Sequence, residues 1–224
     1  MKKFFGVCIA VSAASMGLSQ SFNIEIDTQG TTPSSSFGAV GLAGTWNTVG
    51  IGSQPANVSG TNILGLNGVA TAADFSWQNL QWFTSMTLPS GSADERALLQ
   101  DAANASGPFS FSSLLNGLYD VILYTIPTGV PQSTTFTIGQ QSLTTSGAGW
   151  TGSFIEGATH VKFSNVSVTD GTLSILTSVD PFGGMSGLQL VYRGDAPVPE
   201  PFTMTLLGAA AVAGYRRIKR GRTV

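Results

Sequence analysis

Short runs of alternating polar and apolar residues, separated by glycine-rich turns, fill the chain from residue 22 to residue 193. The run Phe22-Asn23-Ile24-Glu25-Ile26-Asp27 is the clearest, because its three apolar side chains fall on one face of an extended strand. The chain of 224 residues holds 28 glycines, well above the usual ~7%. This pattern predicts many short strands joined by turns, and the composition excludes a long coiled coil.

About ten strands are expected, at a spacing of roughly 8–15 residues that is typical of a sandwich or jelly roll. Residues 117–126 are apolar on both faces apart from Asp120, so this strand is expected to be central. Gly139-Gln140 and Asp170-Gly171 are expected to form turns. The other strands are predicted at residues 22–27, 45–49, 62–66, 71–77, 134–138, 141–145, 159–163, 166–169, 172–179 and 187–192.

A single helix is predicted after Ser92. Ser92-Ala93-Asp94-Glu95 fits a capping box, with Ser92 as the N-cap and Glu95 at the third helical position. The helix is expected to end near residues 104–107, after an apolar face formed by Ala97, Leu98, Leu99, Ala102 and Ala103. The expected fold class is therefore all-β, a jelly-roll-type β-sandwich with one short helix, built from residues 22–195 as one domain.

Charge is scarce and unevenly distributed. Only 10% of residues are charged while 42% are hydrophobic, so the chain can bury a core and disorder is not expected. Residues 22–195 hold three basic and eleven acidic side chains, a formal charge of −8. A body this acidic gains little from phosphate contacts, so nucleic acid is not expected as a partner.

The N-terminus has the features of a secretory signal peptide, assigned to residues 1–21. Lys2 and Lys3 precede the short apolar run 4–14, and small residues suit cleavage after Ser19 or Ser21. The run is too short to span a bilayer. The only cysteine lies inside this signal, so disulfides, thiolate catalysis and thiolate metal sites are excluded from the mature chain.

The C-terminus, residues 196–224, has three parts. A proline-rich spacer at residues 197–201 precedes an apolar run of 14 residues, 202–215, and a basic cluster follows. The run alone measures ~21 Å as a helix, but residues 198–218 can just span a bilayer of ~30 Å as a single transmembrane helix. The positive-inside tendency would keep the basic tail in the cytoplasm and the acidic body outside.

This three-part end resembles the PEP-CTERM sorting signal of certain Gram-negative bacteria. The motif is Val198-Pro199-Glu200-Pro201, and the basic tail consists of Arg216, Arg217, Lys219, Arg220 and Arg222. The resemblance implies that an exosortase processes the chain near the proline motif. It also implies an inner-membrane intermediate and a final location at the cell surface or in the extracellular matrix.

The sequence contains no recognisable catalytic, metal-binding or phosphate-binding motif. His160 is the only histidine, and alternation places it with Lys162 toward water, opposite the inward Val161 and Phe163. Serine and aspartate residues are numerous enough for a Ser-His-Asp arrangement, but no Gly-x-Ser-x-Gly elbow is present. One histidine makes a zinc site implausible, and no phosphate-loop spacing occurs. No catalytic residue, metal or cofactor is therefore predicted.

Paired carboxylates can catalyse glycoside hydrolysis, and the acidic residues offer several candidate pairs. Structural roles account for the adjacent pairs. Glu25 and Asp27 face away from the apolar side of their strand, while Asp94 and Glu95 suit a helix N-terminus. Asp120, on an otherwise apolar strand, is either a buried hydrogen-bonded anchor or a calcium ligand, and the anchor is favoured.

Trp150 is the remaining candidate for binding. Its glycine-rich loop, residues 146–153, leaves two alternatives: an exposed platform for sugar stacking, or a ring folded back onto the core. Most other aromatic residues lie in strand-like runs and are expected in the core.

Residues 114–124, with Gly117-Leu118-Tyr119-Asp120-Val121 at their centre, resemble a strand of galactose-binding-like and malectin-like jelly rolls. Residues 168–175 and 185–191 resemble the last strands of the same folds. These resemblances imply a fold more than an activity. The sequence thus predicts an exported protein with a structural or adhesive role, not an enzyme. The alternative is a carbohydrate-binding module, and the expected partners are the exosortase, the membrane and extracellular polysaccharide.

Overall fold

The structure, a computed structural model, describes residues 20–27, 31–50, 56–85, 87–88, 90–105, 107–127, 129, 132–180 and 183–195. The chain divides into two units, Met1–Gly194 and Asp195–Val224. The predicted signal peptide, up to residue 19, and the predicted sorting segment, residues 196–224, lie outside the described residues. Within the described part of the chain, no helix combines the length and apolar character needed to span a membrane.

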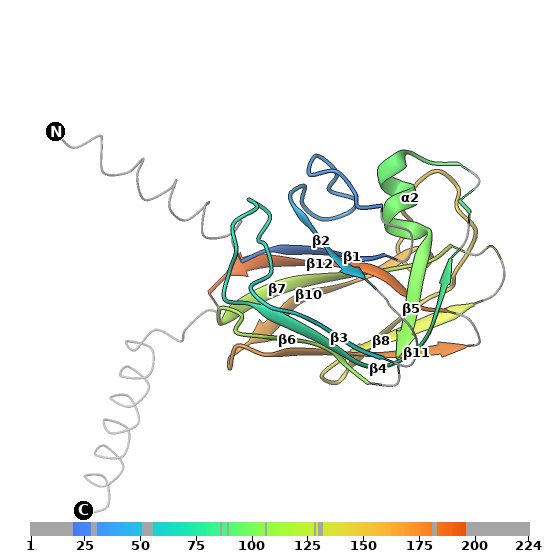
Figure 1. Cartoon of the computed structure of the whole chain (residues 1–224). Helices are drawn as coiled ribbons and strands as arrows, with labels where there is room; N and C mark the ends of the chain where they lie inside the picture. The colour runs from blue at the N-terminus through green and yellow to red at the C-terminus, as the bar shows by residue number, and fades with distance from the viewer. Residues whose placement is uncertain are drawn as a thin grey trace, which may run out of the picture. The chain divides into compact units, whose positions relative to one another are not determined.

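Two layers of strands make up the described body (Figure 1). The first layer is antiparallel except that β1 and β2 run parallel. Its register places Ile24 opposite Leu188 and Val121 opposite Leu190. In spatial order its strands are β10 (His160–Val168), β7 (Gly117–Thr125), β12 (Met185–Gly194), β1 (Phe22–Asp27) and β2 (Trp46–Gly50).

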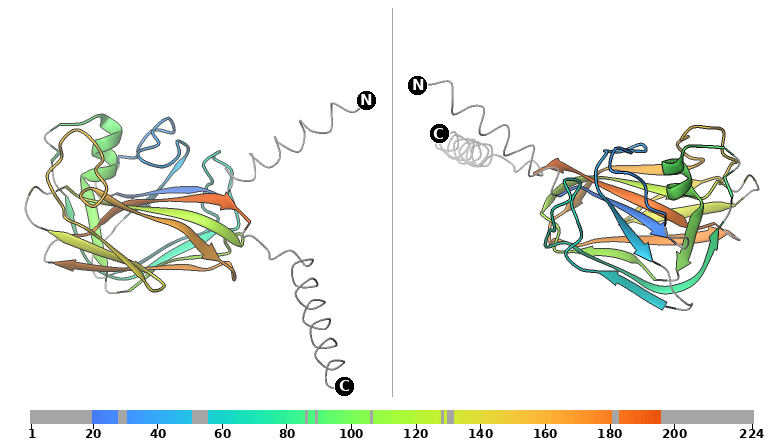
Figure 2. Two further views of the ribbon diagram at one scale, coloured as in Figure 1. Left: turned by 180° about the vertical axis from the view of Figure 1, so that it is seen from behind. Right: turned by 45° about the horizontal axis from the view of Figure 1, so that its top comes forward.

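The second layer is centred on the long strand β4 (Asp74–Ser85), as Figure 2 shows from two further sides. The short helix α2 (Ala93–Leu99) leads from β4 into β5 (Asp101–Ala105). β5 pairs with β4 and also meets β12 through the pair Met185 and Ala103, which links the two layers. The other strands of this layer are β3 (Ala56–Gly60), β6 (Phe109–Ser112), β11 (Leu173–Asp180), β8 (Ser133–Ile138) and β9 (Gln141–Thr145).

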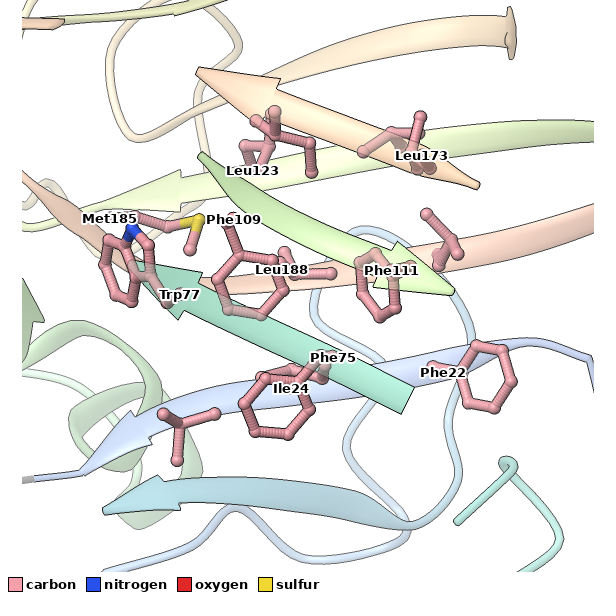
Figure 3. Packing of buried hydrophobic residues seen from close by; sticks show 14 of the residues in the cluster. Phe22, Ile24, Phe75, Trp77, Phe109, Phe111, Leu123, Leu173, Met185 and Leu188 are labelled. Carbon is pink, nitrogen blue, oxygen red and sulfur yellow. The ribbon is translucent and has the colours of Figure 1, made fainter. Parts of the chain in front are cut away.

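The hydrophobic core fills the space between the layers (Figure 3). The alternation in β1 sends its apolar side chains inward, where Phe22 stacks against Phe111 with ring centroids 6.5 Å apart. Phe109 contacts Phe75 in a stacked arrangement and Trp77 edge-on, with both centroid distances 5.5 Å. Each fully buried side chain of this size contributes about 1.5–3 kcal/mol. The described residues thus form a β-rich body with one short helix, consistent with a β-sandwich.

Several predicted elements are confirmed. The capping box is present, with the Glu95 amide donating to the Ser92 hydroxyl and the Ser92 amide donating to the Glu95 carboxylate. The hairpin of β8 and β9 turns at residues 139–140 as expected. The two strands expected at 159–163 and 166–169 are one strand, β10, interrupted by a bulge between Phe163 and Val166.

Other predictions are wrong. Residues 62–66 form no strand, since only Leu64 makes an isolated bridge, to Ala70. The helix ends at Leu99 instead of near 104–107, and β5 follows it. The alanines of β5 fit a helical pattern equally well, but pairing with β4 decides their conformation. β3, β5 and β6 were not expected: β3 and β5 carry little β-branched or alternating signal, and β6 alternates Phe and Ser over only four residues.

Candidate functional site: an uncharged groove beside β10

A groove of about 400 Å³ opens between the tip of the β8–β9 hairpin, the first residues of β11 and the middle of β10. Its size falls in the range of small-ligand sites. Val166 and Leu173 supply apolar surface, and Leu173 is buried. The lining residues are Ile138, Gly139, Gln141, Ser164, Asn165, Val166, Ser167, Thr172, Leu173 and Ser174.

The groove exists because β9 and β10 diverge. At one end, β9 is tied to β7 and to the segment before β10: the Thr125 hydroxyl of β7 donates to the Thr145 hydroxyl at 3.2 Å, and the Ser146 amide, just after β9, donates to the Gly157 carbonyl at 2.9 Å. At the other end, β10 bulges and Asn165 takes a left-handed φ of +56°. Bulges bend a strand and redirect its side chains. The bulge residues therefore form one wall of the groove.

Asp120 fixes the bulge from the neighbouring strand β7. Its Oδ1 accepts a hydrogen bond from the Asn165 amide at 3.1 Å, and its Oδ2 contacts Lys162 at 2.8 Å and Arg193 at 2.5 Å. Burial opposes ionisation, but hydrogen bonds from Arg193, Lys162 and the Asn165 amide outweigh it and lower the pKa of Asp120 to about 2. Asp120 is therefore the buried anchor, the favoured of its two predicted roles.

None of the described residues that line the groove has a titratable side chain. Gln141, Asn165 and four hydroxyl side chains offer both donors and acceptors, beside the apolar surface of Val166 and Leu173. Two carboxylates contact the lining from behind: Asp170 accepts a hydrogen bond from the Thr172 hydroxyl at 2.7 Å, and Asp120 accepts one from the Asn165 amide while it holds Lys162 and Arg193. Chemically, the groove suits a neutral ligand with many hydroxyl groups and a hydrocarbon face. Sequence reasoning missed it, because hydroxyl residues at a strand bulge carry no motif.

Trp150 is not part of this groove. Its side chain is 9% exposed and packs edge-on against Phe154, with ring centroids 5.3 Å apart. Of the two alternatives that the sequence left open, the structure has the ring folded back. It belongs to a second apolar cluster on the outer face of the first layer, together with Trp46, Leu88, Leu98, Leu99, Ile122 and Tyr124.

The prediction that His160 faces water is wrong. The residue is only 4% exposed. Its ring lies 5.9 Å from that of Tyr124 and 6.3 Å from that of Phe154, because the 150–159 segment covers this part of the sheet. Burial lowers the pKa of His160, so a neutral ring is favoured. Within the described residues, no group of three or more His, Cys, Asp or Glu side chains is placed to hold a metal ion.

Glu25 occupies an environment that the sequence did not reveal. It points to the outer face of β1 as predicted, yet it is fully buried, and neither carboxyl oxygen has a hydrogen bond of good geometry. α2 covers this position: a side chain at Gly187, the register partner of Glu25, would meet Leu98 of the helix. Burial first, and then the charges of Asp27 and Asp101, raise the pKa of Glu25 to about 9, with Thr48 opposing in part.

Comparisons with known proteins give partial structural likenesses. Neither a protein-family model nor a curated protein sequence matches the chain. A calcium-binding mutant of Bacteroides uniformis β-glucuronidase 2 is 12% identical over 67% of this chain, with a TM-score of 0.37. A Cry1Da tryptic core variant from Bacillus thuringiensis is 11% identical over 63% of the chain, with a TM-score of 0.29. The chain spans 20% and 30% of the lengths of these two structures.

Proposed function

We propose that this protein is exported, sorted through its C-terminal segment by an exosortase, and held at the cell surface or in the extracellular matrix in an adhesive role. The support for export and sorting is the combination of the lysine-led apolar N-terminus with the proline motif, apolar run and basic tail. The acidic body, kept outside the membrane, is the part that makes external contacts.

The adhesive contact in this proposal is the groove beside β10, and its ligand is a neutral extracellular polysaccharide. The observation that carries this is the lining, whose described residues combine hydroxyl and amide groups with apolar surface and include no titratable side chain. Sugars present hydroxyl edges and hydrocarbon faces, so this mixture suits them better than it suits ions or lipids. The finer fold assignment, a jelly roll of the galactose-binding-like type, belongs to the same proposal.

The second candidate function, a carbohydrate-binding module, differs from the adhesive role in the kind and strength of sugar binding that it requires. As a module it would bind a defined oligosaccharide tightly; as an adhesive protein it would bind polymer weakly at many copies. Titration with soluble oligosaccharides and with the parent polymer distinguishes the two candidate functions, because only the module retains its affinity for a short chain.

Sorting is tested by replacing Pro199-Glu200-Pro201 with three alanines. Export should persist, because the predicted signal peptide is separate, while C-terminal processing should stop. Intact-mass analysis of the wild-type protein from its native host is the companion measurement. A mature wild-type chain that still ends at Val224 would contradict the exosortase proposal.

Groove binding is tested with a substitution that fills the groove. Ser167 is exposed on its wall, so Ser167→Trp should abolish binding to a glycan array while leaving the thermal midpoint nearly unchanged. Thr151→Trp, at an exposed loop position away from the groove, is the matched control. Unaltered glycan binding by Ser167→Trp, or no glycan binding by the wild type, would overturn the proposed site.

A further inference from the structure

The outer face of the second layer carries a row of serines that crosses four strands. Ser59 of β3 pairs with Ser76 of β4, Ser76 pairs with Ser110 of β6, and Ser110 pairs with Ser174 of β11. Directly paired residues of antiparallel strands point to the same side of a sheet. The apolar neighbours of these serines, such as Phe75 and Phe111, are buried in the core. The serines therefore point outward, and none of the four is buried.

Two further rows continue the same face onto the β8–β9 hairpin. Ser178, Thr135 and Thr144 form one row, and Leu176, Thr137 and Ser142 form the other. The Thr135 and Thr144 hydroxyls lie 2.8 Å apart, as do those of Thr137 and Ser142. These mutual hydrogen bonds fix the side chains, so a ligand meets hydroxyls that are already ordered. We call the three rows the hydroxyl face.

The chemistry of the hydroxyl face excludes most kinds of partner. None of the residues in its three rows is titratable, and the acid in the next row of the same face, Asp74 opposite Ser112, adds negative charge. Both features disfavour nucleic acid and anionic lipid headgroups. Leu176, 51% exposed, is its one large apolar side chain. A single leucine cannot supply the apolar centre that a stable protein interface or a second copy of this chain requires. What remains is a neutral partner that is itself rich in hydroxyls.

The spacing of the rows indicates the form of that partner. Neighbouring strands lie about 4.8 Å apart, and outward residues on one strand lie about 6.8 Å apart, so the hydroxyls repeat in two directions. A single flexible oligosaccharide can match one row at most. Packed, parallel sugar chains present hydroxyls that also repeat in two directions. Ser174 belongs to both the hydroxyl face and the groove, which makes the two surfaces continuous.

We propose that the hydroxyl face docks on the ordered surface of packed, uncharged polysaccharide chains. The choice of polysaccharide rests on the function proposed above, but the site is distinct from the groove. The groove would take a single chain or chain end, and the hydroxyl face would lie against the assembled solid. The two surfaces can therefore be disabled separately.

The test uses the purified full chain in mild detergent and measures depletion from solution by microcrystalline cellulose and by crystalline chitin. The face variant combines Ser110→Glu with Thr135→Glu, which places two charges on the central rows. The control combines Thr151→Glu with Thr169→Glu, both exposed and outside the face. Wild type and control should adsorb to at least one solid, and the face variant should lose at least tenfold in partition coefficient. Should the face variant unfold, Thr144→Glu at an exposed position of the same face replaces it.

Binding of soluble oligosaccharides distinguishes the two proposals. The groove variant Ser167→Trp should lose soluble ligands and still adsorb to the solid, while the face variant should do the reverse. Wild-type binding of soluble sugars without adsorption to either solid would overturn the hydroxyl face alone. Equal adsorption of wild type and face variant would also overturn it. A wild-type protein that binds neither soluble nor solid glycans would overturn both proposals.

Discussion

The two layers of the body have similar inner faces and opposite outer faces. Both send apolar side chains into the shared core. On the outside, α2 and segments 31–45 and 148–158 cover much of the first layer, and Asn23, Glu25, His160 and Gln189 are buried there. The second layer shows bare rows of serine and threonine. Alternating strands alone therefore do not determine whether an outward polar residue meets water or protein.

The difference arises from what each sheet offers for packing. Outward Ile122 and Tyr124 on β7, with Trp46 on β2, give the first layer an apolar patch on which Leu98 and Trp150 pack. Gln189 then ties the covering loop to the sheet: it accepts hydrogen bonds from the Gly41 amide at 2.9 Å and from the Tyr124 hydroxyl, and donates to Asn23 at 2.8 Å. The hydroxyl face has only Leu176, so nothing comparable can pack on it.

The largest expected effect is on the covered side. Trp150→Ala should lower the free energy of unfolding by about 3–5 kcal/mol, because it empties a buried aromatic site. Chemical denaturation of the protein measures this. Ile155→Ala, in the same loop but 45% exposed, is the control and should change stability by less than about 0.5 kcal/mol. A Trp150→Ala protein as stable as the control would mean that the ring is not part of the packed cover.

Glu25 should give the covered face a pH dependence. Its folded-state pKa of about 9 exceeds the ordinary 4.5, so the folded state holds a proton that the unfolded state releases. This contribution is complete below pH 4.5 and is lost as the pH rises toward 9, by about 1.4 kcal/mol per pH unit. Between pH 7 and pH 9 the free energy of unfolding should fall by about 2–3 kcal/mol.

Glu25→Gln, which imitates the protonated acid, should remove most of this slope, whereas Glu156→Gln at an exposed position should keep it. Urea titrations at pH 7, 8 and 9 supply the comparison. The lowered pKa values of His160 and Asp120 act below this range and do not interfere. A slope that is the same in both variants would show that Glu25 is not the group responsible.

The hydrogen bonds beneath the 38–42 loop should contribute less. Gln189→Met keeps the length of the side chain but leaves Asn23, Tyr124 and the Gly41 amide short of a partner. The expected loss of stability is about 1–2 kcal/mol. Gln140→Met, in the exposed turn between β8 and β9, serves as the control. Amide hydrogen exchange at Val40 and Gly41 should be faster in Gln189→Met, which would place the loss of stability in this loop. Unchanged exchange at both amides would contradict the prediction.

The sequence predicted the inner faces well and the outer faces poorly, for a physical reason. Period-2 alternation is local, so it correctly placed Phe22, Ile24 and Ile26 on one face and Glu25 on the other. Whether another segment covers Glu25 or His160 depends on contacts between residues far apart in the chain, such as Leu98 above Gly187. Asp120 was the exception, because a lone acid on an apolar strand already indicates a buried partner. The groove depends on the bulge at Asn165, which no local pattern marks.

The smallest expected effect on stability is that of substitutions on the hydroxyl face, in contrast to substitutions on the covered outer face of the first layer. Replacing Ser59, Ser76, Ser110 and Ser174 together by alanine removes four outward hydroxyls, none of them buried. The fourfold variant as a whole should lose less stability than the about 1–2 kcal/mol expected for Gln189→Met, because each such substitution changes the free energy of unfolding by at most about 0.5 kcal/mol in either direction and water replaces what the hydroxyl contacted. Chemical denaturation of the fourfold variant is the measurement, with Gln189→Met as the reference from the covered face. If the row is instead part of the framework, the fourfold variant will lose more stability than Gln189→Met. A near-neutral result would mean that stability does not account for four serines in one row, and it would support a role for them in contacts outside the chain.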